Sequence, residues 1–333
     1  MIAPIESNPK ISLDVLILCR NEAPFLRTLG KSLQSLFLPE GLEIHFKFFD
    51  NCSTDGSQEI INEFSISNKT LFTQKVNIGG FGNFKFAYTK IDADYFMFMD
   101  AHDYLTSMYF NDFYSSVLSL PDKKFAHIGQ IITLAESSNM FFPAEIQNKM
   151  EFSRNNSYRA FQLVLFLFHN SIYHAIFPTK FFDIQNLISS KSFIVDHLIT
   201  HAGLAQCNIK YLENSFYVRR YREIVGPDFA HWVNNEIQTR SERGLGDISN
   251  EINNTSIAIE ISSLMQIKNP FYNKILVYLL KGKYKISRLP MFAYRIIRFI
   301  SNNLLPFNRV FTSPGDIPDD IYIEVVNMNT MTN

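Results

Sequence analysis

Three clusters of polar side chains each follow an apolar segment in the amino-terminal third of the sequence. The clusters are Cys19-Arg20-Asn21-Glu22, Asp50-Asn51 and Asp100-Ala101-His102-Asp103. Carboxylates accept hydrogen bonds from N–H donors such as those of a nucleobase. Carboxylates and imidazole can also ligate divalent cations, which neutralise phosphate charge. These residue types could therefore bind a nucleotide together with a metal ion.

The apolar segments before the three clusters are expected to form buried strands. Residues 14–18 and 95–99 are short continuous apolar runs, and residues 43–49 alternate between apolar and polar types. Helical spacing of apolar residues from Phe25 to Leu36 predicts a helix between the first two strands. Such alternation predicts a mixed α/β fold with a mainly parallel sheet flanked by helices. Ligands bind beyond the carboxyl ends of the strands in such sheets, so the clusters should meet there.

Further elements are predicted up to residue 212 from the same periodicities. The predicted helices cover residues 57–64, 109–118 and 192–203, and a glycine-rich turn at residues 79–82 leads to a helix that ends near residue 91. The predicted strands lie near residues 71–76, 125–133, 171–177 and 208–212.

Composition excludes several classes of protein. The chain has 333 residues, 46% of them hydrophobic, and its 31 basic and 32 acidic residues nearly cancel. A core-forming composition excludes intrinsic disorder, and near-zero net charge argues against a nucleic-acid partner. Three widely spaced cysteines exclude a disulfide framework. With no signal peptide and no apolar run of about 18 residues, the expected location is the cytoplasm.

A separate charge pattern marks the carboxyl-terminal part of the chain. No acidic residue occurs between Glu260 and Asp316, whereas lysines and arginines are spread among apolar residues in helical spacing. Basic amphipathic helices of this kind bind anionic membrane surfaces, so residues 261–315 could attach the protein peripherally to the inner face of the cell membrane. The alternative is that they pack on protein, either the first domain or a second copy in a homo-oligomer.

The first two clusters also carry a family resemblance. Asp50-Asn-Cys-Ser-Thr-Asp-Gly-Ser57 resembles the D-D-x-S-x-D motif of family 2 glycosyltransferases, which have the GT-A fold. Further motifs follow in the family's order: Leu16 to Glu22, Asn77-Ile-Gly79, Tyr95 to Asp103, Val195 to Leu198, Ala202-Gly203 and Tyr211 to Arg219. The resemblance covers about residues 12–222. It implies a GT-A-like catalytic domain at residues 1–225 and a mostly helical, basic extension at residues 226–333.

The resemblance implies an inverting transfer of a sugar from a UDP-sugar to a hydroxyl of a glycan or lipid-linked acceptor, in bacterial cell-surface polysaccharide synthesis. Asp50 would accept the imide N–H of uracil, which cytosine lacks. The nucleotide sugar would be bound by Cys19, Arg20, Asn21, Glu22, Asp50, Asn51, Asn77, Gly79, Lys85, Asp100 and Ala101. Arg219, Arg220 and Arg222 could contact phosphate, although exposed basic residues are usually only solvated.

The third cluster supplies the metal candidates Asp100, His102 and Asp103, which would bind Mn²⁺ or Mg²⁺. His102 stands in the middle of the family's D-x-D motif, and imidazole is a better ligand for Mn²⁺ than for Mg²⁺. Three interpretations stay open: His102 ligates the metal, Asp103 does so instead, or the reaction depends only weakly on metal. Acidic residues after a strand also serve as turn caps.

The general base implied by the resemblance is Asp196, which would take the proton of the acceptor hydroxyl. Val195 stands where the family has an acidic residue. Two other functions are considered. A sugar nucleotidyltransferase would need a glycine-rich phosphate loop after the first strand, and residues 20–24 lack glycine. A catalytically silent nucleotide-sugar or glycan-binding protein is compatible with His102 and Val195.

Overall fold

The structure is a computed structural model, and its described residues are mostly those of the amino-terminal two-thirds of the chain. They are residues 10–120, 124–135, 140–143, 170–182, 199–200, 202–203, 206–221, 323–324 and 327. Asp196 and residues 261–315 lie outside the described residues, as does almost all of the predicted extension. The division into domains at residues 225 and 226 therefore stays a prediction.

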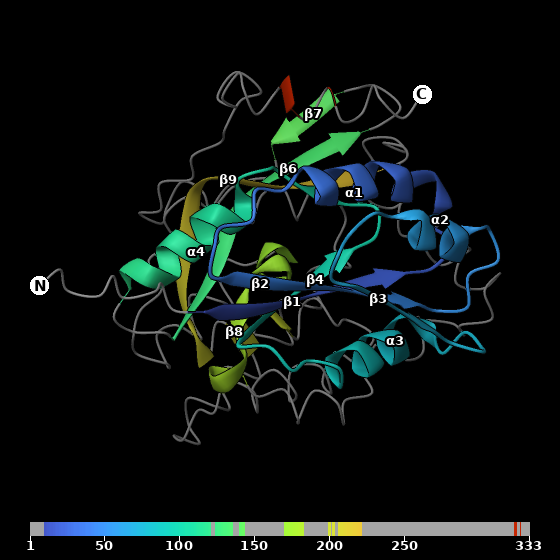
Figure 1. Cartoon of the computed structure of the whole chain (residues 1–333), viewed down its shortest axis with the longest axis horizontal. Coiled ribbons are helices and arrows are strands. Elements are labelled where there is room, and N and C mark those ends of the chain that lie inside the picture. Colours follow the sequence, from blue (N-terminus) through green and yellow to red (C-terminus); the bar gives the residue numbers. More distant parts are fainter. Residues whose placement is uncertain are drawn as a thin grey trace, which may run out of the picture.

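The first sheet has five strands in the order β3-β2-β1-β4-β8 (Figure 1). The strands are β1 (Ile11–Cys19), β2 (Leu42–Asp50), β3 (Lys69–Thr73), β4 (Tyr95–Asp100) and β8 (Phe177–Pro178). The first four run parallel, and β8 pairs antiparallel with β4. The predicted mixed α/β fold with a mainly parallel sheet is thus confirmed.

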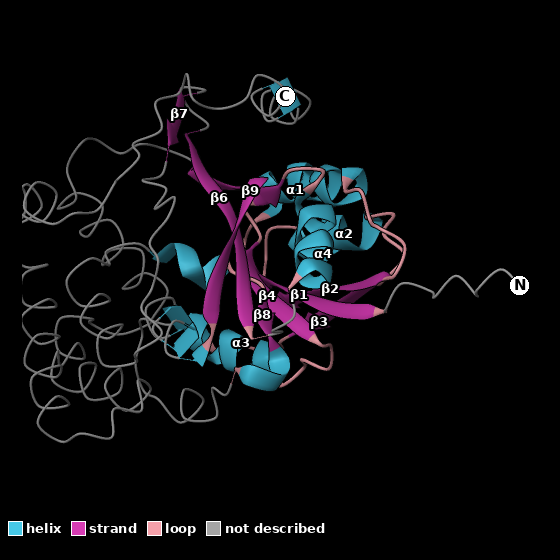
Figure 2. Ribbon diagram, turned by 90° about the vertical axis from the view of Figure 1, so that its left-hand side faces the viewer, coloured by secondary structure: helices cyan, strands magenta, loops and turns pink. Residues whose placement is uncertain are grey.

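Helices cover both faces of this sheet. The helices α1 (Ala23–Ser35) and α2 (Ser57–Glu63) lie on one face, and α3 (Gly79–Tyr88) lies on the other (Figures 1 and 2). Pro24 occupies the first turn of α1, where its missing N–H leaves no bond unmade. A Cβ on Gly30 would lie 2.5 Å from the Phe64 ring, so glycine permits the close contact of α1 with the residue that ends α2.

A second sheet of four strands has the order β5-β9-β6-β7. Its strands are β5 (Tyr104–Leu105), β6 (Phe125–Ala135), β7 (Met140–Pro143) and β9 (Asn208–Tyr221). The helix α4 (Tyr109–Ser119) joins the two sheets, because Phe110 contacts Phe46 of β2 and Phe113 contacts Tyr95 of β4, while the helix also packs on β9. The short β5 follows the third polar cluster directly and pairs with β9.

Two predicted segments differ from the structure. Residues 171–177 were expected as a strand, but Asn170–His174 is a 3₁₀ helix, Ile176 forms an isolated bridge with His127, and the strand is only Phe177–Pro178. The glycines at 79–82 were expected as a turn, but they are the first residues of α3, which ends at Tyr88 rather than near residue 91. Asn77 explains this early start, since its Oδ1 accepts the Gly79 N–H at 2.9 Å.

Glu324, near the end of the chain, contacts the segment between β5 and α4. The Ser107 backbone N–H and Oγ donate to the Glu324 carboxylate at 2.7 and 3.3 Å. Ser107 lies between β5 and α4, and its carbonyl accepts the Phe37 N–H. Among the described residues, no helix is long and apolar enough to cross a bilayer.

A buried histidine makes the fold sensitive to acid. The His127 ring packs against Tyr95 and Phe113, and neither ring nitrogen has a hydrogen-bond partner among the described residues. Burial and the nearby Lys210 charge lower its pKa to about 3. The unfolded chain takes up a proton near pH 6.5 and the folded chain does not. The free energy of unfolding should therefore fall as the pH drops below 6.5.

We expect His127→Phe to flatten this pH dependence. Between pH 7 and pH 5, protonation of His127 in the unfolded chain should lower the free energy of unfolding of the wild type by about 2 kcal/mol. Phenylalanine does not titrate, so the variant lacks this contribution. Urea unfolding of both proteins at the two pH values measures the difference. The aromatic surroundings suit phenylalanine, so the variant should be folded at pH 7. Equal losses in the two proteins would contradict the prediction.

Candidate functional site

The parallel register brings the three polar clusters to one edge of the first sheet. Cys19 of β1 is paired with Asp50 of β2, and Leu18 is paired with Asp100 of β4. The backbone continues the ladder beyond the strand ends, because Asn51 N–H donates to Cys19 O and Ala101 N–H donates to Leu18 O. The clusters expected to meet at the carboxyl ends of the strands are therefore neighbours.

Asp50 is fully buried at this edge. Its Oδ2 accepts hydrogen bonds from the Ser53 N–H at 3.0 Å and from Gln58 Nε2 at 2.7 Å. Its Oδ1 is buried and has no partner among the described residues. Leaving a buried carboxylate oxygen unpaired costs free energy. A ligand that presents an N–H or O–H donor to Oδ1 would recover that cost.

The turn after β1 and the turn after β2 are linked by a set of hydrogen bonds. Asn21 adopts a left-handed backbone (φ 55°), and its Oδ1 accepts the Thr54 N–H at 2.9 Å. In return Ser53 Oγ accepts the Asn21 N–H, and Ser57 Oγ accepts the Glu22 N–H. The Asn21 side-chain oxygen and the backbone N–H groups of residues 21 and 22 thus hold these turns together.

Asp55 joins the same linkage at the start of α1. Its carboxylate accepts hydrogen bonds from the Ala23 N–H and from the N–H and Oγ of Ser57. Burial acts to raise the pKa of this carboxyl, but these hydrogen bonds outweigh burial and lower the pKa. The linkage therefore contains a charged carboxylate at neutral pH.

Asn51 and Asn77 hold the segment that leads into α3. Asn51 Nδ2 donates to Asn77 Oδ1 at 2.8 Å, and Asn51 Oδ1 accepts the Ile78 N–H at 2.9 Å. Gly79 has φ 76°, a conformation that a Cβ would strain. Lys85 lies further along α3 with its Nζ 4.3 Å from the centre of the Phe81 ring. Arg20 Nη1 donates to Asn51 O at 3.3 Å, which connects this group to the end of β1.

Asp100, His102 and Asp103 gather in the loop after β4. Each residue offers one atom that could ligate a metal, and these three atoms lie within 4.8 Å of one another. His102 Nδ1 is 3.5 Å from Glu22 Oε1, and its Nε2 is 3.7 Å from Asp103 Oδ1. Two carboxylates and an imidazole at this spacing suit a divalent cation, so the residues fit the metal that the motif implies.

The charges of this loop are mutually dependent. Burial acts to lower the pKa of His102, but the carboxylates of Asp103, Glu22 and Asp100 raise it well above its usual value. Burial raises the pKa of Asp100, and the Asp103 carboxylate adds to the rise. A cation would compete with the imidazole proton and would stabilise both carboxylates in their charged form.

Arg220 matches neither alternative considered from the sequence, a phosphate contact or an exposed, solvated side chain. Its guanidinium is buried, donates to Phe25 O at 2.8 Å and to His102 O, and lies between the rings of Phe25 and Tyr104. Arg220 therefore contributes to the structure of the loop. Arg219 is half-buried, and its charge affects the pKa of Asp100.

Several residues of the site had no assigned role in the sequence. Ser53, Asp55 and Ser57 lie within the quoted motif, so their spacing was a usable signal. Gln58 lies one residue beyond it, and Tyr217 lies within the quoted segment from Tyr211 to Arg219, where nothing distinguished it from its neighbours. Asp196 lies outside the described residues, so its role as general base stays a prediction.

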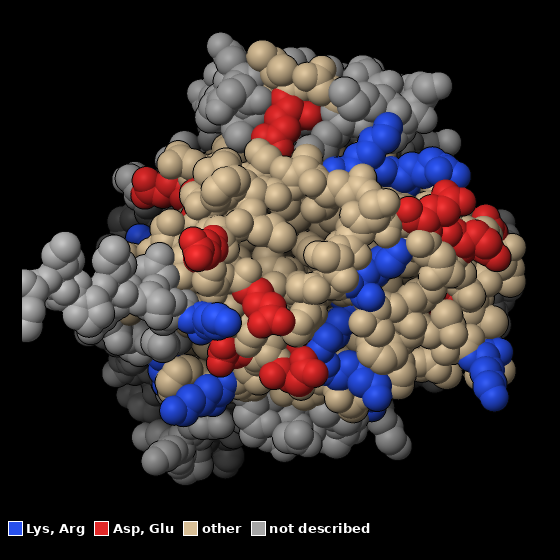
Figure 3. All heavy atoms as spheres, viewed as in Figure 1, with Lys and Arg blue, Asp and Glu red and all other residues tan. Residues whose placement is uncertain are grey.

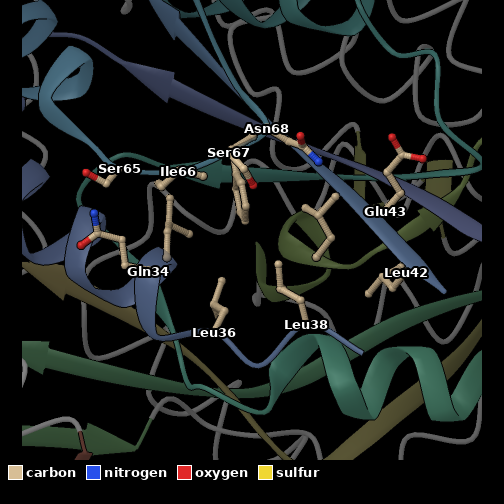
Figure 4. A pocket seen from close by; sticks show the side chains of 12 residues that line it. Gln34, Leu36, Leu38, Leu42, Glu43, Ser65, Ile66, Ser67 and Asn68 are labelled. Carbon is tan, nitrogen blue, oxygen red and sulfur yellow. The ribbon is translucent and has the colours of Figure 1, made fainter. Parts of the chain in front are cut away.

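Cavity and surface features lie away from the strand ends. A cavity of about 420 Å³ lies at the opposite edge of the sheet, between the end of α1, the start of β2 and the segment before β3 (Figure 4). Leu36, Leu38 and Leu42 line it, and none of the predicted site residues does. On the face drawn in Figure 3, acidic and basic side chains of the described residues are interspersed.

Comparisons with solved structures show a shared fold. The chain is similar to S. aureus TarS residues 1–349, with a TM-score of 0.54 and 14% identity over 91% of this chain and 98% of that one. The complex of that fragment with UDP-GlcNAc gives a TM-score of 0.54 at 13% identity, with the same coverage. Against the longer TarS structure, the TM-score is 0.52 at 13% identity, and the match covers 87% of this chain but only 55% of that one.

Sequence comparisons give the family. No curated protein sequence matches the chain significantly. The model of glycosyl transferase family 2 matches residues 14–174, which contain the three polar clusters and the linked turns between them. The resemblance that the motifs predicted is therefore confirmed over residues 14–174, which match the family model of the glycosyl transferases of family 2.

Proposed function

We propose that this protein transfers a sugar from a UDP-sugar to a hydroxyl group of a glycan or lipid-linked acceptor, with inversion at the anomeric carbon. The observation that carries the proposal is the Oδ1 of Asp50, which has no partner among the described residues. It is buried at the carboxyl ends of the strands, beside the cluster of Asp100, His102 and Asp103. The family match gives the class of reaction, and the acceptor and its place in surface polysaccharide synthesis follow from the resemblance alone.

The nucleoside would enter at Asp50. Uracil presents an imide N–H that can donate to Oδ1, whereas cytosine presents an acceptor at the same position. Ser53 and Gln58 hold the other oxygen, so the carboxylate cannot turn away from the base without losing two hydrogen bonds. The TarS fragment has been solved with UDP and with UDP-GlcNAc, which agrees with a uridine nucleotide on this fold.

The diphosphate would lie over the loop after β4. This loop, with the cluster of Asp100, His102 and Asp103, would form the site of Mn²⁺ or Mg²⁺, which when bound supplies positive charge that stabilises the departing diphosphate. Imidazole among the donors favours Mn²⁺. Glu22 helps to keep the His102 ring in place, since its carboxylate is 3.5 Å from Nδ1. Asp196 would then take the proton from the attacking hydroxyl.

Donor hydrolysis tests this proposal against a silent binding protein. The purified chain is incubated with UDP-glucose, UDP-galactose or UDP-GlcNAc, with Mn²⁺, with Mg²⁺ or with EDTA, and released UDP is measured. We expect UDP release with at least one donor, and faster release with Mn²⁺ than with Mg²⁺. In parallel, saturating UDP should raise the melting temperature more than CDP does. Stabilisation by UDP without any release would favour the binding protein, and no response to UDP would contradict the nucleotide assignment.

A further inference from the structure

Within the cluster of Asp100, His102 and Asp103, the side chain of Asp103 has a different environment from the other two. Its side chain is 1% exposed, whereas that of His102 is 33% exposed. Both oxygens of Asp103 accept hydrogen bonds from β9: Oδ2 from the Tyr217 hydroxyl at 2.8 Å and Oδ1 from the Arg220 N–H at 3.0 Å. The carboxylate therefore faces the second sheet, and its oxygens are engaged with protein donors.

The same two residues of β9 also hold the rest of the loop. The Tyr217 hydroxyl lies 3.4 Å from the Asp100 N–H, and Arg220 Nε donates to the His102 carbonyl. Arg220 Nη2 donates to the Phe25 carbonyl in α1. The loop is thus tied at residues 100, 102 and 103 to one strand, and through Arg220 to the helix that follows β1.

Tyr217 is itself fixed on its other side. The His174 ring stacks on it with centroids 4.1 Å apart, and His174 Nδ1 is 3.3 Å from Phe98 O of β4. Tyr217 is fully buried and so has little freedom to change rotamer. A rigid partner of this kind can set the position of a loop without touching a ligand of that loop.

We infer that Asp103, Tyr217 and Arg220 are positioning residues that hold the loop after β4, and that Asp100 and His102 are the groups that contact the cation. This inference rests on the proposed function for the identity of the ligand. It accounts for the pairing of the second sheet with this loop: β5, directly after Asp103, pairs with β9 at Tyr104 and Val218.

Conservative variants separate a positioning residue from a ligand. In Asp103→Asn, the amide oxygen can still accept from the Arg220 N–H, and the amide nitrogen can donate to the Tyr217 oxygen. Mn²⁺ affinity, measured by electron paramagnetic resonance in the presence of UDP, should then stay within about threefold of wild type. Asp100→Asn is the matched variant at a proposed ligand, and its affinity for Mn²⁺ should fall on the order of 100-fold. Tyr217→Phe, which removes no possible ligand, should weaken it about 10-fold.

A second measurement needs no metal and so is independent of the proposed function. Melting temperatures in EDTA are compared for Tyr217→Phe, Asp103→Ala and the double variant. If the hydroxyl acts through the carboxylate, the double variant should melt no lower than the worse single variant. Additive losses would overturn the positioning role, as would Asp103→Asn losing Mn²⁺ as severely as Asp100→Asn. If Asp103→Ala does not fold, the cycle is run with Asp103→Asn. If the wild type binds no Mn²⁺ but the losses are non-additive, the proposed cation site fails while the positioning role stands.

Discussion

Asp196→Asn is expected to abolish sugar transfer while UDP binds as tightly as to the wild type. A neutral amide cannot accept the proton of the acceptor hydroxyl, and general-base catalysis contributes about 10²- to 10⁴-fold to such rates. UDP should be unaffected because the proposed base contacts the acceptor rather than the nucleotide. Calorimetry with UDP and a transfer assay on the same preparation measure the two effects.

The control for this prediction is Glu59→Gln, an equivalent neutralisation on the exposed side of α2. It should transfer sugar at the wild-type rate. Turnover of Asp196→Asn at that same rate would exclude Asp196 as the base. Loss of UDP affinity in parallel with activity would instead indicate a role in folding or donor binding.

Asp50→Asn is expected to lower the affinity for UDP about 10- to 100-fold and to reduce or reverse the preference for UDP over CDP. The Ser53 N–H and Gln58 Nε2 both donate to Oδ2, so the asparagine oxygen must take that place. Its Nδ2 would then face the base, where it opposes the uracil imide N–H but can donate to cytosine N3.

Titration of both nucleotides by calorimetry gives the ratio of affinities, which separates base recognition from a general loss of structure. Gln58→Leu serves as the companion variant. It removes the 2.7 Å hydrogen bond that orients the carboxylate, so it should weaken UDP by a smaller factor and leave the preference for UDP in place. An unchanged UDP to CDP ratio in Asp50→Asn would show that the base lies elsewhere.

The central strands β1 and β4 could be predicted from the sequence because nearly all of their residues are buried. The runs before Cys19 and Asp100 are continuous and apolar, and the polar residue that ends each run marks the strand end. The meeting of the three clusters followed from the rule for parallel sheets and needed no contact information.

The interactions that shape the site could not be predicted in the same way. Asp103 and its partner Tyr217 are more than a hundred positions apart, and no local pattern distinguishes Tyr217 from the other tyrosines of β9. The unpartnered Oδ1 of Asp50 depends on which donors reach the other oxygen. Residues 171–177 are apolar enough for a strand, but pairing with β4 involves only Phe177 and Pro178, so tertiary context decides their conformation.

The bond between Glu324 and Ser107 has a consequence for how the basic part of the chain can move. β9 ends at Tyr221, and Glu324 contacts Ser107, which lies between β5 and α4. Residues 222–322 are therefore joined to the described part of the chain at both ends, at Tyr221 and at the Glu324 contact. Closing a loop restricts the reach of its middle, though the entropic cost rises only slowly with length. A membrane that binds residues 261–315 would thus be connected to the amino-terminal domain through the chain on both sides of this segment. Removal of the last ten residues, which include Glu324, would leave only the connection from β9.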